Sequence, residues 1–141
     1  MVSDLWVYYP ADALKSDHSY CGIGYTEIAG EILVFGDVCY PKNDGKFWKS
    51  DANAVGTMPV TAMALGSISA DVKGNFLESG MIRDDSWSWT VGGLVYASLT
   101  TGALTQDISG YTTGDQVQVA GVAFKSNILL FRPGLEIVEI A

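Results

Sequence analysis

The first residues that could carry chemistry are a histidine and a nearby cysteine. His18 is the only histidine of the chain, so any serine or cysteine nucleophile would need it as the base. His18 lies in a polar stretch, residues 15–19, that is expected to be solvated, and Cys21 follows three residues after it. Residues three apart in an extended loop do not automatically face each other, so no nucleophilic site is predicted from this pair.

Two adjacent carboxylates form the second candidate. Asp84 and Asp85 suggest the carboxylate pair of glycoside hydrolysis, in which two acids face each other across a substrate. Adjacent residues of an extended chain point to opposite sides. The segment around them is therefore interpreted as a polar turn, with one aspartate capping it through a side-chain hydrogen bond.

Other ligand patterns are weak. Cys21 and Cys39 lack the spacing of a zinc site and are interpreted as two buried free thiols, with a disulfide between them as the less favoured alternative. The aspartates of the predicted turns do not follow the calcium-loop pattern, and no phosphate-binding glycine motif is present. We therefore predict no catalytic residue, no metal and no cofactor, and the chain is expected not to be an enzyme.

The tryptophans are the strongest candidates for a binding surface. Trp87 and Trp89 are two positions apart in a predicted strand and would share one face, while Trp48 follows a predicted turn. Paired indoles serve as sugar-stacking platforms, as interface anchors or as core residues. Burial, within a protomer or between protomers, is favoured over sugar binding.

The composition predicts an all-β protein. Hydrophobic residues make up 48% of the 141 residues and charged residues 17%, a balance typical of a folded domain. Sixteen glycines break the apolar runs into short segments, which favours strands joined by turns over long helices. We expect a compact barrel-like or sandwich-like fold of short antiparallel strands. Strands are predicted at 5–9, 32–40, 46–49, 58–69, 76–82, 86–90, 94–98, 103–106, 116–124, 128–131 and 135–140.

An internal repeat is the main organisational pattern. In each half a hairpin is followed by a loop, a long apolar strand and a hairpin partner, which predicts two small β units at 31–83 and 92–141. Any two β meanders resemble each other to some extent, so chance similarity is the alternative explanation of the repeat. Residues 1–30 are assigned to an N-terminal arm with the first strands, and residues 31–141 to one β-rich domain.

The net charge of −8 limits the partners. An acidic surface repels phosphate backbones and anionic membrane surfaces, so neither nucleic acid nor membrane is an expected partner. The first ten residues lack the basic region and the long apolar run of a secretory signal. We expect synthesis in a cytoplasm.

Several segments together resemble the head decoration, or capsid cement, proteins of tailed bacteriophages and some phage tail-fibre modules. They are GDVCY at 36–40, DGKFWKSDA at 44–52, TMPV at 57–60, IRDDSWSW at 82–89, GGLVY at 92–96, LTQ at 104–106 and QVQVAGVA at 116–123. The resemblance covers about three-quarters of the chain, and the motifs are informative mainly in combination.

The resemblance implies a non-enzymatic virion protein on the outer capsid surface. It would form a homotrimer, bind the major capsid protein and stabilise the shell. The alternative is a tail-fibre or receptor-binding module that recognises host surface glycans. The N-terminal arm would pair with a neighbouring chain or form the first strand of its own domain. The candidate interface residues are Leu5, Trp6, Val7, Tyr8, Tyr9, Trp48, Trp87 and Trp89.

Overall fold

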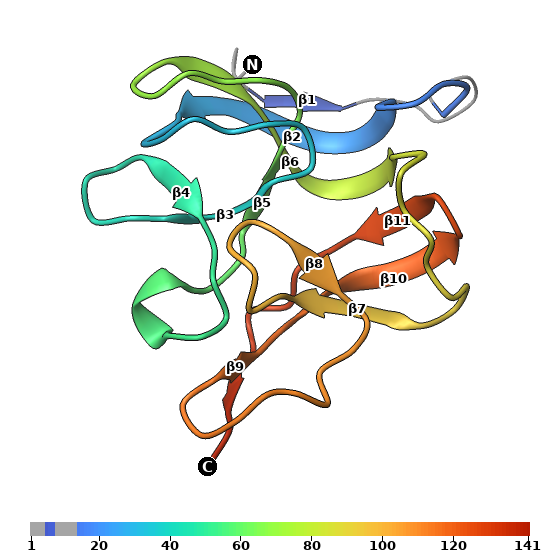
Figure 1. Ribbon diagram of the computed structural model, residues 1–141. Helices are drawn as coiled ribbons and strands as arrows, with labels where there is room; N and C mark the ends of the chain where they lie inside the picture. The colour runs from blue at the N-terminus through green and yellow to red at the C-terminus, as the bar shows by residue number, and fades with distance from the viewer. Residues whose placement is uncertain (1–4, 8–13) are drawn as a thin grey trace.

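The computed structural model describes residues 5–7 and 14–141, which form an all-β fold with one short 3-10 helix (Figure 1). The prediction of short antiparallel strands is confirmed. The elements are β1 (Leu5–Val7), β2 (Tyr20–Ile28), β3 (Val38–Pro41), β4 (Phe47–Lys49), η1 (Val55–Thr57), β5 (Ala62–Ala64), β6 (Lys73–Arg83), β7 (Leu94–Ala97), β8 (Leu104–Thr105), β9 (Gln116–Val117), β10 (Val119–Lys125), β11 (Ile128–Phe131) and β12 (Val138–Glu139). Among the described residues, no helix is long and apolar enough to cross a membrane.

One curled antiparallel sheet contains most of the strands. Its main path runs β4-β3-β5-β6-β11-β10-β7-β8, and β2 pairs with β6 and also with β1. Each half begins with a hairpin at one end of this path and ends with a strand at its centre. In that direction the first half runs β4-β3-β5-β6 and the second half runs β8-β7-β10-β11, so corresponding strands occupy the same positions. These two sets fall within the units predicted at 31–83 and 92–141. The sequence repeat itself stays a prediction, because strand order alone does not establish it.

The long strand β6 lies at the centre of the sheet. It pairs along its length with β2, from Ile28 opposite Lys73 to Tyr20 opposite Ile82. Within this pair, Gly22 and Gly80 face each other with φ of +140° and +157°. A side chain at either position would meet the partner backbone within 2.3 Å, so only glycine fits this crossing.

Two apolar clusters cover the sheet unequally. The larger cluster lies on the inner face and contains residues of both halves, such as Met63, Leu77, Val95 and Leu129. The smaller cluster lies on the opposite, outer face of the first half only. Its members are Ala29, Leu33, Cys39, Phe47, Ala62, Ala64, Ile68 and Phe76. The first half is therefore buried on both faces.

Backbone hydrogen bonds between loops close the curl. Gly102 accepts from Val38 at 3.1 Å and donates to Ser50 at 2.8 Å, and Ala52 donates to Ser98 at 3.0 Å. The buried amide of Gln118 adds a second connection, because it bonds both the N–H and the C=O of Val60, at 2.7 and 2.9 Å. The two halves thus form one unit in which loops from each half meet.

The expected strand positions were partly wrong. Residues 86–90 form a turn and irregular chain rather than a strand, and the run at 58–69 contains only the three residues of β5. The longest additional strand is β2, which was expected only as unspecified first strands within 1–30. The turn at 43–45 is confirmed: Gly45 has φ of +80° and links β3 to β4.

Candidate functional site

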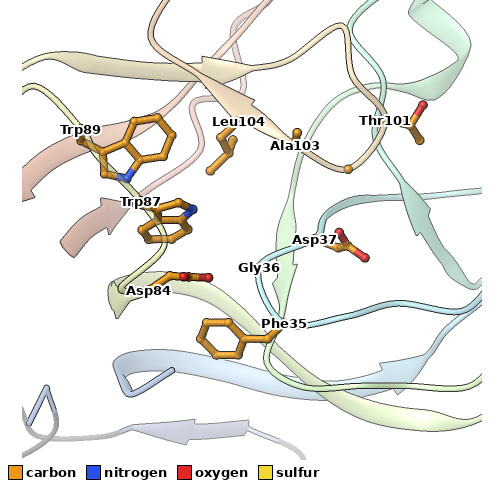
Figure 2. Close-up of a pocket in the computed structure, with 10 residues that line it drawn as sticks. Phe35, Gly36, Asp37, Asp84, Trp87, Trp89, Thr101, Ala103 and Leu104 are labelled. Atoms are coloured by element: carbon orange, nitrogen blue, oxygen red, sulfur yellow. The ribbon is translucent and has the colours of Figure 1, made fainter. Parts of the chain in front are cut away.

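A pocket of about 250 Å³ opens where loops of the two halves meet (Figure 2). Three segments far apart in the sequence line it: the loop before β3, the connection from β6 to β7, and the β7–β8 loop. The lining residues are Phe35, Gly36, Asp37, Asp84, Trp87, Trp89, Thr101, Gly102, Ala103 and Leu104. We call it the aromatic–acidic pocket.

Two indoles form one wall of this pocket. The ring centroids of Trp87 and Trp89 lie 5.5 Å apart at 46°, so the predicted pair does come together. The reason differs from the prediction: the turn at Asp84, and not strand alternation, places the rings. Both rings also pack against the large core cluster, so they are partly core residues and partly pocket wall. The indole nitrogen of Trp89 is buried and has no hydrogen-bond partner.

Two carboxylates also line the pocket: Asp37 lies across from the indoles, and Asp84 lies next to Trp87 (Figure 2). Asp84 is buried, and its Oδ1 accepts from the amide and hydroxyl of Ser86 at 2.9 and 2.6 Å. Asp37 Oδ2 accepts from the amide of Val34 at 2.9 Å. Burial raises the pKa of the Asp37 carboxyl, although the Val34 amide and the Lys49 ammonium act in the opposite direction.

The turn-capping role expected of one aspartate belongs to Asp84, whose carboxylate bonds Ser86. Asp85 points elsewhere and binds Arg83 at 2.7 Å and Asn127 at 2.9 Å. The Arg83 guanidinium and the Asn127 amide lower the pKa of the Asp85 carboxyl. The two neighbouring acids therefore do not face each other across a common site.

His18 and Cys21 also have separate surroundings. The His18 ring stacks on Phe35 with centroids 4.1 Å apart, beside two carboxylates. Cys21 is buried in β2, opposite Met81. Both cysteines are free and buried, as predicted. Burial raises the pKa of the Cys39 thiol far above its usual range, which keeps this thiol protonated.

Trp48 does not join the pocket. Its indole nitrogen donates to Asp44 at 2.9 Å, and the Lys42 ammonium lies 4.1 Å from the ring centroid. The ring lies so close to Gly30 that a Cβ there would be 2.2 Å from it. These contacts hold the β3–β4 hairpin against the preceding loop, so Trp48 has a complete set of local partners.

The N-terminal candidates are only partly described. Leu5, Trp6 and Val7 form β1, which pairs with Ile23, Gly24 and Tyr25 of β2 in the same chain. Tyr8 and Tyr9 lie outside the described residues. The structure thus places this segment as a first strand of its own sheet.

An apolar row that crosses the second half and reaches β6 was not among the predicted sites. Leu94, Val122, Leu130 and Met81 stand opposite one another across β7, β10, β11 and β6. We call these four residues the outer row. Their sequence neighbours Val95, Ala123, Leu129 and Ile82 all belong to the inner core cluster. Because alternate residues of a strand point to opposite faces, the outer row lies on the other side of the sheet.

The outer row is less covered than the outer face of the first half. Leu94 is 45% exposed, and the nearby Val91 and Phe124 are 62% and 56% exposed. Val122, Leu130 and Met81 are half-buried. The alternation of polar and apolar residues at 116–124 predicts a strand with two different faces. It does not show which of these faces remains exposed in the fold.

No protein-family model matches the chain, and no curated protein matches it significantly.

Proposed function

We propose that the protein is a non-enzymatic virion structural protein that decorates and stabilises the outer surface of a phage capsid as a homotrimer. The sequence motifs supply the family resemblance, and the half-open outer face of the sheet supplies the structural support. Its partners are further copies of itself and the major capsid protein.

The outer row is the observation that carries the proposal. In the first half, loop residues such as Leu33 and Ile68 cover the outer face. In the second half, the described residues supply no comparable cluster over Leu94 or the adjoining Phe124. A contiguous exposed apolar surface is typical of a site where another protein binds. In the trimer this surface packs against a neighbouring copy, and the oligomer then places several such units over a shell.

Introducing a charge on this face tests the proposal. Phe124→Asp puts a carboxylate into the apolar contact and is expected to convert trimers into monomers, as measured by light scattering. Ile32→Asp is the matched control, because Ile32 is 68% exposed and outside the outer row; its mass is expected to equal that of the wild type. Trimers of undiminished mass in Phe124→Asp would contradict the interface.

A second candidate function is supported by the aromatic–acidic pocket. Indole rings stack on the C–H faces of sugars, while carboxylates such as Asp37 and Asp84 accept hydrogen bonds from hydroxyls. In Figure 2 the indole nitrogen of Trp87 is turned toward the open middle of the pocket, where it offers a donor. This combination fits the receptor-binding alternative, in which the chain recognises host glycans.

Substitutions of Trp87 and Trp48 distinguish glycan binding in the pocket from simple burial of the Trp87 ring. With a panel of neutral mono- and disaccharides and tryptophan fluorescence as the readout, Trp87→Ala is expected to abolish any saturable binding. Trp48→Ala is the control, because Trp48 already has Asp44 and Lys42 as partners. Absence of binding to the wild type, or equal loss in both variants, would exclude the pocket as a glycan site.

A further inference from the structure

A histidine and two carboxylates from separate segments converge beside the aromatic–acidic pocket. His18 Nε2 lies 3.7 Å from Asp17 Oδ2 and 3.6 Å from Asp84 Oδ2. The three potential ligand atoms all lie within 4.8 Å of one another. Asp17 and His18 precede β2, whereas Asp84 follows β6, so the cluster joins residues more than sixty positions apart.

Both carboxylates are oriented by their other oxygen. Asp17 Oδ1 accepts from the backbone amide of Asp85 at 2.8 Å. Asp84 Oδ1 accepts from Ser86, and Asp84 itself is only 8% exposed. In each case this leaves Oδ2 directed to the imidazole. Carboxylates that bind metals are held in the same way, by hydrogen bonds from outside the coordination sphere.

The imidazole is also held in place. The backbone of His18 adopts φ of +62°, and its amide donates to the carbonyl of Arg83 at 3.0 Å. The ring lies flat on Phe35, with an interplanar angle of 21°. All three side chains are thus oriented by contacts that do not involve one another.

The distances between the ligand atoms indicate what fits between them. At 3.6 and 3.7 Å they are longer than a normal hydrogen bond. A tetrahedral ion with bonds of about 2.1 Å holds its ligand atoms roughly 3.4 Å apart. Imidazole with carboxylates suits zinc and neighbouring transition metals, whereas calcium and magnesium prefer all-oxygen sites.

We propose that Asp17, His18 and Asp84 bind one divalent transition-metal ion of the size of zinc, with water completing its coordination. The ion ties the segment that precedes β2 to the turn that follows β6, and so fastens the N-terminal part of the chain to the centre of the sheet. This site is independent of the proposed capsid role, which could fail while the metal site stands.

The primary test is calorimetric titration of the chelator-treated protein with Zn²⁺. We expect saturable binding of one ion per chain, and a rise in melting temperature with Zn²⁺ concentration because the ion binds the folded state. His18→Ala and Asp84→Asn are each expected to weaken binding by at least about 100-fold, since even indirect partners of metal ligands contribute 10- to 100-fold.

Asp85→Asn is the matched control. It removes the same charge from the neighbouring position, but the Asp85 oxygens bind Arg83 and Asn127 rather than facing His18. Its affinity for Zn²⁺ is expected to stay within about threefold of the wild type, an effect typical of a nearby charge in a screened environment. An equal loss in Asp85→Asn and Asp84→Asn would mean that only general negative charge attracts the ion, and would overturn the proposal.

A measurement on the wild-type chain tests the site even if the variants do not fold. Because His18 is the only histidine, its ring protons give unique resonances, which paramagnetic Co²⁺ is expected to broaden at one equivalent. The Co²⁺ complex should lack thiolate-to-metal absorption, since both cysteines are buried elsewhere. Unaffected His18 resonances, or a strong thiolate band, would refute the site.

Discussion

The two halves of the sheet have the same strand order but differ in how their outer faces are covered. The outer residues of the first half, such as Phe76, pack under loops of the same chain and are fully buried. The outer row of the second half contains Leu130 in the corresponding central strand, only half-buried. A common scaffold thus combines a half whose outer face is covered by its own loops with a half whose outer face is only partly covered.

The largest expected effect is the loss of stability when a side chain on the buried outer face of the first half is truncated. Phe76→Ala removes a fully buried aromatic ring from the first half and is expected to lower the free energy of unfolding by about 4 kcal/mol. Leu130→Ala removes a half-buried side chain from the second half and should cost about 1 kcal/mol in the isolated chain. Urea unfolding at low protein concentration measures both. Equal costs would contradict the difference between the two outer faces.

The next effect concerns the connection between the halves. Gln118→Met keeps the volume but leaves the buried N–H and C=O of Val60 without partners, at a cost of about 3 kcal/mol. Gln106 offers a natural control, because it makes the same pair of bonds to Thr90 at a more exposed position. Water can replace the Gln106 bonds, so Gln106→Met should cost about 1 kcal/mol or less. Thermal unfolding of the two variants tests this order.

The smallest expected effect is a pH dependence that involves Tyr25, which packs against the outer cluster of the first half, and Tyr111 of the second half. Burial raises the pKa of Tyr25 to about 12, helped by Glu78 and Glu27, and raises that of Tyr111 to about 12, helped by Asp115 and Asp51. A pKa above the unfolded value of about 10 means that the stabilisation is complete below pH 10 and is lost as the pH rises through 12.

Urea titrations at about pH 9 and about pH 11.5 measure this loss. Tyr25→Phe and Tyr111→Phe should each lose less stability than the wild type over that interval, because one ionisable phenol is gone. Tyr111→Phe should also be slightly less stable at pH 9, since the Tyr111 hydroxyl donates to the carbonyl of Ala97. A pH dependence unchanged in both variants would show that these phenols ionise as they do in the unfolded chain.

Much of the fold could be predicted from local patterns. The turn at Gly45 and the short apolar runs around Val95 and Leu129 indicated strands, because glycine and alternation are local properties. β2 was less evident, because Gly22, Gly24 and several polar residues interrupt its apolar pattern. Its strand structure depends on pairing with β6, which is a long-range interaction.

The candidate sites were harder to predict. The aromatic–acidic pocket depends on the curl of the sheet, which brings Phe35, Trp87 and Leu104 together from three segments. The sequence located the tryptophan pair for a wrong local reason, since residues 86–90 are not a strand. The proximity of His18 and Asp84 was missed as well, because it depends on the long-range pairing of β2 with β6, which brings the segment before β2 beside the turn after β6.

The most direct test of the proposed function is the mass of the protein in solution, measured by light scattering over a range of concentrations. The chain weighs 15.1 kDa, so the proposed homotrimer weighs three times 15.1 kDa, or about 45 kDa. We expect this mass for the wild type and about 15 kDa for Phe124→Asp, because the variant charges the open face of the second half. A wild-type protein that stays monomeric at all concentrations would contradict the account.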